Sequence, residues 1–372
     1  MRHLKYAVGA AVLCATTAHA GGIDRSGQSV SVIFEDGNYA ELSLGVVAAS
    51  VSGTSVAALG SRDSGDMAGN FIAFSGAYKH QFSDALSGAL IIDQPYGANV
   101  DYPVSTFYYA QGSTAELVSN AVTGVLRYKL PSNVSVFGGL RYQTLSAKAF
   151  IPFVTAVPGV TPPYSANGAN DGAVGYLIGA AFEKPEIALR VALTYNSEIK
   201  HMLATAETSV FGALNTTTPI TTPQSVNLEI QSGIAKNTLL FGSIRWVEWS
   251  KFDISPKVYG ALTSGGSLVS YDADTITYSV GVGRKFSDAF SGAVTIGYEG
   301  PTGGFASNLG PTDGFWSIGV GGTYTQDNMK ITGGVRYVAI GDADTTLNKT
   351  TAAANFTGNS AIAAGVKIGF TF

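Results

Sequence analysis

The residue types that perform acid–base or nucleophilic chemistry are scarce in this sequence. The only cysteine is Cys14, which falls within a predicted signal peptide, so the mature chain has no thiol for catalysis, disulfides or metal binding. The histidines outside that peptide are His80, in a predicted turn, and His201, at the start of a predicted loop at the opposite end of the fold. Neither has an evident serine and acid partner. We therefore expect no catalytic residues, no metal site and no cofactor.

Binding chemistry is better represented, in two predicted loops that carry large apolar side chains. These loops cover residues 149–171 and 201–222. The loops of a pore for ions or sugars should be polar, whereas exposed apolar patches commonly mark binding sites. The sequence thus predicts a surface that captures a hydrophobic small molecule, and it leaves open that the two loops fold over each other as a lid. The predicted contact residues are Phe150, Ile151, Phe153, Val154, Met202, Leu203, Phe211 and Leu214.

The first twenty residues predict export from the cytoplasm. Arg2 and Lys5 form a positive start, residues 6–17 an apolar centre, and Ala18-His19-Ala20 a signal-peptidase site. The apolar run is much shorter than the roughly 20 residues that a membrane-spanning helix needs. Removal of the peptide leaves 20 of the 22 basic residues against 26 acidic ones, without a basic block, so nucleic acid is not an expected partner.

The composition is apolar, yet the mature chain has no long apolar run. Charged residues make up 13% of the chain, about half the share in an ordinary soluble domain. Glycine is abundant, with 46 residues, and aromatic residues reach 11%. Such a chain must distribute its apolar residues by alternation, which in a bilayer means β-strands with one face toward lipid.

Short polar turns and long loops alternate along the chain. The short turns are residues 80–84, 129–133, 183–186, 235–237, 284–288 and 324–328. Six short turns and seven long loops connect fourteen strands, an even number with both ends on one side. The sequence therefore predicts a 14-stranded antiparallel transmembrane β-barrel with short periplasmic turns and long extracellular loops. The predicted strands centre on residues 40–50, 70–80, 84–93, 116–130, 134–147, 173–183, 186–199, 225–234, 238–249, 274–285, 289–299, 314–325, 329–340 and 359–372.

The last strand shows the alternation most clearly. Ile362, Ala364, Val366, Ile368 and Phe370 fall on one face, and small or polar residues fall on the other. If the apolar faces meet lipid, several charged side chains project into the lumen, because a lysine or arginine facing lipid costs about 2–4 kcal/mol at the bilayer midplane. These lumenal residues are Arg127, Arg141, Arg190, Glu229, Arg245, Arg336 and Lys367.

Three segments resemble the FadL-type outer-membrane transporters of long-chain fatty acids and other hydrophobic molecules. Residues 190–200 resemble the seventh strand of that family, Trp249-Ser250-Lys251-Phe252 its Trp-Ser-x-Phe at the end of strand nine, and Asp313-Gly314-Phe315-Trp316 the start of strand twelve. No single motif is specific, but together with the strand count they extend the resemblance over the whole mature chain.

The resemblance implies a route for a hydrophobic ligand. The ligand is caught by the third and fourth outer loops, passes to an interior pocket, and leaves sideways through an opening caused by a kink in strand three. Pro95-Tyr96-Gly97, just after the predicted third strand, are the candidates for that kink, since proline lacks a donor and glycine weakens pairing; an ordinary outer turn is the alternative. The resemblance also implies basic residues that meet a fatty-acid carboxylate, with Lys148 and Lys257 as the matches and Arg141 as a weaker one.

One departure concerns the segment before the first strand. The family fills its lumen with an N-terminal hatch that carries an Asn-Pro-Ala motif, whereas only residues 21–38 precede the first strand here, without that motif. We expect residues 1–20 to be the signal peptide, 21–38 a short hatch-like segment in the lumen and 39–372 the barrel. Gating by the family's usual plug is therefore in doubt.

Two alternatives to a transporter of hydrophobic molecules remain. A general or substrate-selective diffusion porin usually has about 16–18 strands and a polar constriction, neither of which this sequence predicts. A barrel that serves as an adhesin or phage receptor would also have long loops. The other expected partners are outer-membrane lipid and the barrel assembly machinery, because a terminal aromatic residue, Phe372, resembles the signal that this machinery recognises.

Overall fold

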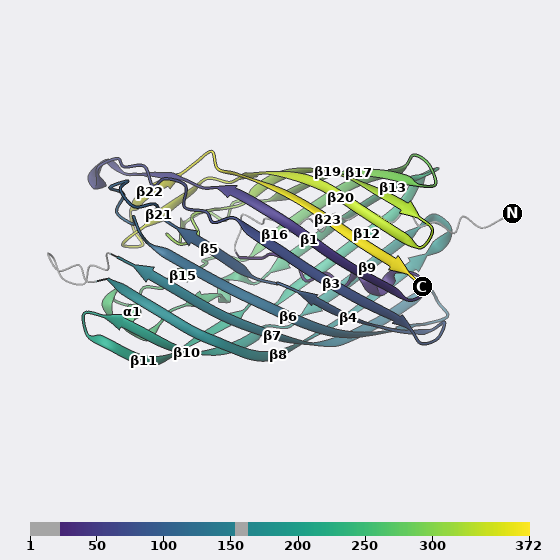
Figure 1. The fold of residues 1–372 in the computed structure, drawn as a ribbon, viewed down its shortest axis with the longest axis horizontal. Helices are drawn as coiled ribbons and strands as arrows, with labels where there is room; N and C mark the ends of the chain where they lie inside the picture. Colours follow the sequence, from purple (N-terminus) through teal and green to yellow (C-terminus); the bar gives the residue numbers. More distant parts are fainter. Residues whose placement is uncertain (1–22, 153–162) are drawn as a thin grey trace.

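The chain forms a closed β-barrel with steeply tilted strands (Figure 1). The computed structural model describes residues 23–152 and 163–372, so the predicted signal peptide lies outside the described residues. The cylinder closes because β1 pairs with β3 on one side and with β23, the last strand, on the other. Every pairing in the wall is antiparallel, as in the hairpin architecture that the sequence predicts.

Fourteen strands build the wall, and three of them are split into two labelled pieces. The wall strands are β1 (Tyr39–Ser50), β3 (Phe71–Gln81), β4 (Leu86–Asp93) continued by β5 (Gly97–Asp101), β6 (Thr114–Lys129), β7 (Val134–Ile151), β8 (Tyr164–Lys184), β9 (Leu189–Asn196) continued by β10 (Ile199–Ser209), β11 (Gly212–Thr222) continued by β12 (Ser225–Ala235), β13 (Thr238–Val247), β16 (Thr275–Lys285), β17 (Phe290–Glu299), β19 (Phe315–Gln326), β20 (Met329–Ile340) and β23 (Ser360–Thr371). The predicted fold and strand count are confirmed.

In the residues that the structure describes, the two predicted long loops are largely strand, so the prediction of loops is wrong there. Residues 149–151 and 164–171 extend β7 and β8, and residues 201–222 form the β10–β11 hairpin, which also pairs with β8. The apolar residues of β10 fall on alternate faces: Leu203 points inward and is 1% exposed, whereas Met202 points outward and is 57% exposed. The wall therefore rises higher on this side of the barrel than the sequence predicts.

The long-loop end, on the left in Figure 1, carries the remaining elements. A small sheet joins β2 (Gly53–Ser55), β18 (Phe305–Ala306), β21 (Ala343–Thr346) and β22 (Ala352–Phe356), with η2 (Ala57–Leu59) beside it. Between β13 and β16 lie η4 (Trp249–Lys251), β14 (Asp253–Ile254), α1 (Lys257–Leu262) and β15 (Val269–Ser270). None of the helices in the described part of the chain has the length and apolar character that spanning a membrane requires.

Apolar side chains cover the outside of the barrel and polar ones line the inside. On β23, Ile362 is 59% exposed, while its neighbours Ala361 and Ala363 are buried. The guanidinium groups of Arg127, Arg141 and Arg245 are buried inside the lumen, as the alternation predicts. This register keeps charged groups away from lipid, where each would be costly.

Residues 23–38, here called the N-terminal segment, lie inside the lumen. The turn η3 (Pro185–Ile187) closes a hairpin of the wall, whereas η1 (Ser31–Phe34) belongs to this segment. Ile33 is fully buried in a cluster with residues of β4, β6, β7 and β8, and the ring of Phe34 lies 4.6 Å from the guanidinium of Arg127. Packing against one side of the wall leaves open space along the other side.

Candidate functional site

An apolar pocket of about 50 Å³ lies inside the raised part of the wall. Strands β5, β6, β7, β8, β10 and β11 form its outer side, and the chain from η4 to β15 forms its inner side. Concave, mostly apolar sites suit lipophilic ligands, but this volume is only about a third of the roughly 150 Å³ of a cavity that holds benzene, so such a ligand must widen the pocket to enter. Its lining residues include Ile23, Ala98, Ala115, Leu117, Ala147, Ala149, Ala166, Gly168, Leu203, Ile220, Phe252, Ile254, Leu268, Val269 and Leu309.

Small residues on the strands create the space of this pocket. Ala98, Ala115, Ala147 and Ala166 each present only a methyl group to the interior. Gly168 presents no side chain, and an added Cβ there would lie 2.8 Å from a terminal carbon of Leu203, which would have to shift. The opposite side is formed by larger side chains, so the pocket owes its volume to the wall strands.

The Trp-Ser-x-Phe motif turns the chain back over the barrel mouth. Trp249 and Phe252 are each 1% exposed, and their rings pack edge to face with centroids 5.8 Å apart. The hydroxyl of Ser250 donates to the Asp274 carboxylate at 2.6 Å. The motif thereby directs Phe252 into the apolar pocket and brings the chain that follows across it.

Glu207 holds the short helix α1 in this position. Its carboxylate is buried and accepts hydrogen bonds from the backbone N–H groups of Val258 and Tyr259, at 2.9 and 3.2 Å. It also accepts from the hydroxyls of Tyr164 and Thr216, at 2.7 and 2.6 Å. Burial, and next the bond to Glu207, raises the pKa of Tyr164 well above its ordinary value, so this phenol stays a donor. Sequence reasoning missed Glu207.

The wall has a gap beside the pocket, between β3 and β4–β5. Backbone pairing stops at Gly76 and Ile92 and resumes only at the bridge between Ala68 and Val100. Within this wall gap the backbone N–H of Phe74 donates instead to the side-chain amide of Gln94, at 3.2 Å. The barrier between the lumen and the surroundings is therefore weakened here, because part of the hydrogen-bond ladder is missing. A second break of similar length lies between β8 and β9–β10, where pairing stops at Leu177 and Asn196 and resumes at Gly168 and Thr205.

Pro95, Tyr96 and Gly97 lie at the edge of this wall gap. Between β4 and β5, residues 94–96 face only two residues of β6, because Asp93 pairs with Ala121 and Gly97 with Val118. Tyr96 points inward, is 1% exposed and packs against the Trp249 ring. The structure places the three residues at a break in the third wall strand; passage of a ligand there stays a prediction.

The N-terminal segment fills the wall gap from the inside. The backbone of Arg25 donates to the Pro95 carbonyl at 2.8 Å, and Gly97 donates to the carbonyl of Ile23 at 2.9 Å. The guanidinium of Arg25 lies 4.0 Å from the centre of the Phe71 ring and directly against Gly97. Residues 23–25 thus act as a short extra strand along this wall gap.

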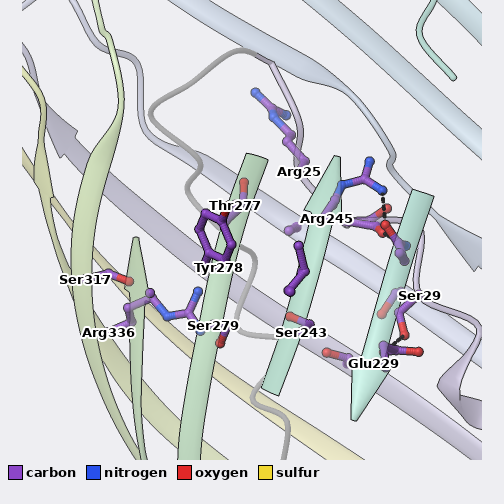
Figure 2. A pocket seen from close by; sticks show the side chains of 18 of the residues that line it. Arg25, Ser29, Glu229, Ser243, Arg245, Thr277, Tyr278, Ser279, Ser317 and Arg336 are labelled. Atoms are coloured by element: carbon purple, nitrogen blue, oxygen red, sulfur yellow. Dashed lines mark hydrogen bonds between the residues drawn. The ribbon is translucent and has the colours of Figure 1, made fainter. Parts of the chain in front are cut away.

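A second, polar cavity of about 160 Å³ lies on the other side of the N-terminal segment (Figure 2). Figure 2 shows Arg25 and Arg336 approaching this space from different sides, with serine and threonine side chains of β13, β16 and β19 between them. Its volume far exceeds the about 10–15 Å³ that one water requires. The cavity reaches the wall gap at Ala73, Phe74 and Gln94.

A buried ion pair anchors the N-terminal segment between the two spaces. The Asp24 carboxylate accepts from Nε and Nη2 of Arg245 at 2.8 and 2.7 Å, and both side chains are less than a tenth exposed. Ser26 donates to Asp93 at 2.5 Å. Because Ile23 lines the apolar pocket and Arg25 the polar cavity, this anchored stretch separates one from the other.

The predicted apolar contact residues separate into two groups. Leu203 lines the apolar pocket and Ile151 packs at its rim, while Phe150, Met202, Phe211 and Leu214 are between 41% and 66% exposed on the outside. The alternation of β7, β10 and β11 explains the split, since neighbouring residues face opposite sides. Phe153 and Val154 lie outside the described residues.

The three predicted carboxylate-binding residues do not come together. Lys148 contributes to the lining of the apolar pocket, but its side chain is 61% exposed and its ammonium lies 3.9 Å from the Glu116 carboxylate. Lys257 begins α1 and is exposed to solvent. Arg141 is buried, but it donates to Thr123 at 3.0 Å and to Asn196 at 3.2 Å. Strand register and the position of α1 thus separate these groups.

The histidines occupy separate environments. His80 is at the short-turn end of β3, where Nδ1 lies 3.3 Å from the Tyr78 hydroxyl. His201 is within β10, not at the start of a loop as predicted, and is buried with Nδ1 3.0 Å from Asp171. In the two described ranges, no group of three or more His, Cys, Asp or Glu residues has an arrangement that fits a metal ion.

Comparison with known proteins agrees with this architecture. A family model described as outer membrane protein transport protein (OMPP1/FadL/TodX) matches residues 30–372. No curated protein matches the chain in sequence.

Several solved structures share the fold at low sequence identity. A Pseudomonas aeruginosa FadL homologue has a TM-score of 0.76 and 13% identity, with 92% of each chain covered. The Pseudomonas putida toluene transporter TodX gives 0.66 and 12%, with 96% of this chain and 97% of the other covered. The Ralstonia pickettii toluene transporter TbuX gives 0.64 and 14%, with 91% and 90% covered. At these identities the similarity establishes the barrel fold.

Proposed function

The chain belongs to the OMPP1/FadL/TodX family of outer-membrane transport proteins, and we propose that it passively carries long-chain fatty acids or other hydrophobic small molecules across the outer membrane. It is a multi-pass barrel of the bacterial outer membrane and a transport protein, not an enzyme. The ligand is captured by the exposed apolar side chains of the raised wall, held in the apolar pocket and released sideways through the wall gap.

The observation that carries this proposal is the position of the apolar pocket relative to the wall gap. Ala98 lines the pocket and belongs to β5, the strand that begins at the edge of the gap. A molecule leaving sideways stays in contact with apolar surface and enters the lipid, whereas a path down the lumen meets the polar cavity. Burial of apolar area is favourable by about 25 cal/mol per Å², so the sideways route keeps a lipophilic ligand out of water.

The barrier on this route is the N-terminal segment. Ile23 closes the pocket from below, and Arg25 occupies the gap. Because the segment is attached by hydrogen bonds and one ion pair, a limited movement of residues 23–26 joins the pocket to the gap. Neither nucleotide nor ion coupling is needed, since the ligand runs down its own gradient.

Uptake by whole cells tests the proposal. A strain without the protein should take up radiolabelled oleate or toluene more slowly than the same strain that expresses it. Ala166→Phe places a ring in the apolar pocket and should abolish the difference. Ala169→Phe, on the exposed side of the same strand, is the matched control and should not. Equal uptake with and without the protein for both probes would refute the transport proposal.

A diffusion porin is the second candidate, because the polar cavity offers room for water and small solutes. Planar bilayers separate the two functions. The transporter should show little steady ion conductance while the N-terminal segment is docked. Large steady conductance in the unmodified protein, together with uptake of small hydrophilic solutes, would instead favour the porin.

A further inference from the structure

The second break in the wall separates residues 169–176 of β8 from residues 197–204, at the join of β9 and β10. We call it the β8–β10 gap. The two strands pair on both sides of it, and each contributes the same number of unpaired residues, so they part and rejoin without a net slip of register. Backbone N–H and C=O groups that lose their ladder need other partners.

Side chains replace the ladder at both ends of this gap. At the end nearer the short turns, the Ser197 hydroxyl accepts from the Tyr176 backbone N–H at 2.9 Å, and the Ser197 backbone donates to the Tyr176 carbonyl at 2.9 Å. At the other end, the Asp171 carboxylate accepts from Nδ1 of His201 at 3.0 Å and from the backbone N–H of Met202 at 3.2 Å. A side chain releases such a bond by changing its rotamer, which is fast compared with the opening of a backbone ladder.

The middle of the gap has glycines on β8 and is filled by side chains of neighbouring strands. A Cβ added at Gly175 would overlap Ile199, and one added at Gly172 would overlap the hydroxyl of Tyr142. Ile199 is 3% exposed and lies on the inner side, whereas Tyr142 is 51% exposed on the outer side. The seal of the β8–β10 gap therefore consists of side chains, while the N-terminal backbone seals the wall gap between β3 and β4–β5.

The β8–β10 gap lies between the exposed apolar residues of the raised wall and the apolar pocket. Met202 is 57% exposed on the outside, whereas Leu203 is 1% exposed and lines the pocket. Gly168 and Thr205, which pair at the end of the gap, also line the pocket. A ligand held at Met202 is therefore separated from the pocket by the thickness of one strand.

The two breaks in the wall face different surroundings. Beside the wall gap, Ile72 and Phe74 are 63% and 42% exposed, an apolar rim that suits lipid hydrocarbon. The β8–β10 gap begins at Tyr176, whose ring lies 6.0 Å from that of Tyr195, and includes Lys200, whose side chain is 72% exposed. Tyrosines mark the interface level of a membrane barrel, and charged residues avoid the lipid below it. The β8–β10 gap thus faces head groups and water, from which a hydrophobic molecule arrives.

We propose that the β8–β10 gap is the entrance through which a hydrophobic molecule passes from the outer face of the raised wall into the apolar pocket, and that Asp171 holds it closed. The inference rests on the proposed function and adds an entry point that is distinct from the exit at the wall gap. Release of the Asp171 bonds frees the backbone of Met202. Leu203 can then turn away from Gly168, which opens the way from the outer face to the pocket.

A reversible cross-link across the gap tests the inference on the purified, full-length protein. Val174 and Lys200 both point outward, one residue from the contact between Gly175 and Ile199. Val174→Cys with Lys200→Cys, joined by ethanediyl bis-methanethiosulfonate, should slow the binding of N-phenylnaphthylamine in stopped-flow fluorescence by about tenfold or more. The affinity should stay the same, because closing an entrance changes rates and leaves the bound state as it is. Cleavage of the cross-link by dithiothreitol should restore the rate.

The matched control places the same cross-link where the two strands are paired. Ala180 and Leu193 are ladder partners on the outer face of β8 and β9, nearer the short turns. Ala180→Cys with Leu193→Cys, joined by the same reagent, should bind the probe at the rate of the unmodified protein.

Variants of Asp171 test what holds the gap closed. Asp171→Ala removes the acceptor for His201 and Met202 and should speed binding by about tenfold, the effect expected for losing hydrogen bonds to a charged group. Asp171→Asn keeps an acceptor oxygen and should bind at a rate close to that of the unmodified protein. Heat-modified gel mobility shows that each variant has formed its barrel.

The outcomes separate this inference from the proposed function. An unchanged binding rate in the protein cross-linked across the gap, or a rate that falls only together with the affinity, would overturn the entrance. Uptake by cells that express the unmodified protein would be unaffected by that result. Absence of probe binding to the unmodified protein would count against the transport proposal itself.

Discussion

The ion pair between Asp24 and Arg245 should control how often the N-terminal segment leaves the lumen. Asp24→Asn preserves the shape of the side chain but leaves the Arg245 guanidinium buried without its counter-ion. The two carboxylate contacts, at 2.8 and 2.7 Å, join side chains that are 8% and 4% exposed, so solvent compensates little. The other attachments of the segment, including the bond from Ser26 to Asp93, remain.

The magnitude follows from the cost of an uncompensated buried charge. Removing one partner of a buried pair destabilises by about 3–5 kcal/mol. We take the lower value, because Arg245 keeps its bonds to Ser225 and Asn227 and borders the polar cavity. Since about 1.36 kcal/mol corresponds to a factor of ten, the undocked population should rise by about a hundredfold.

Cysteine labelling measures that population directly. Val30 is 1% exposed in the docked segment, and Cys14, within the predicted signal peptide, is the only native cysteine. A Val30→Cys reporter should therefore react with a bulky maleimide only when the segment undocks. The labelling rate should increase about a hundredfold when Asp24→Asn is added, because a rare opening that limits reaction is then more populated.

Two further variants complete this experiment. Asp36→Cys lies at an exposed position of the same segment and should label at one rate in both backgrounds. Adding Arg245→Gln to Asp24→Asn removes the unpaired charge. The labelling rate of Val30→Cys should then fall part of the way to the rate of the parent protein. If Asp24→Asn leaves the Val30→Cys rate within twofold of its parent, the ion pair does not hold the segment and the reasoning fails.

Three other variants test separate parts of the structure. Deleting Pro95 leaves two residues between Asp93 and Gly97, opposite the two residues of β6 between Val118 and Ala121, so the break in the third wall strand should close. Uptake of a lipophilic probe should then be slower, while its binding is not weakened. Unchanged uptake would contradict release through the wall gap. Glu207→Gln should reduce hydrogen-exchange protection at the amides of Val258 and Tyr259 by about tenfold or more, whereas Glu198→Gln, which loses an exposed pair with Lys200, should not. Deleting Phe372, which is 62% exposed and stacks on Tyr78, should slow barrel assembly in cells while heat-modified gel mobility stays normal; Phe286→Ala at the same end is the control, and equal assembly rates would exclude recognition of the terminal residue.

The fold was predictable because each wall strand has one apolar and one polar face. In β23 the pattern from Ile362 to Phe370 specifies which side meets lipid, and a shift by one residue would exchange the faces. The turns determine which strands are neighbours, since short polar stretches such as residues 235–237 can only connect neighbouring antiparallel strands. Both signals are local in the sequence, and the alternation recurs in the fourteen wall strands, so the fold is predicted many times over.

The raised wall was not predictable, because above the lipid neither face is uniformly apolar. Glu207 and Leu203 share the inner face of β10, and Met202 lies on the outer face. A carboxylate on the apolar-pocket side of a strand does not fit the alternation seen in the other wall strands. It is explained by α1, about fifty residues later in the chain, whose backbone N–H groups donate to Glu207. The sequence therefore shows apolar character here but not strand structure.

The structure keeps the three predicted basic residues apart for a related reason. Lys148 lies near the end of a strand, where one step of register decides whether a side chain points into the lumen or out. Arg25 lies in a segment without periodicity, and its role depends on Phe71 and Gly97, which are remote in sequence. Only the tertiary arrangement distinguishes Arg25 from another isolated arginine such as Arg62.

Residues 23–38 perform several tasks at one place in the lumen. Packing of Ile33 against one side of the lumen fixes its course, and the pair between Asp24 and Arg245 fixes its other end. Next to the Asp24 anchor, Ile23 closes the apolar pocket and Arg25 fills the wall gap. Retention and release of the ligand therefore depend on the same few residues. A variant that frees residues 23–26 should weaken ligand retention and speed ligand release together.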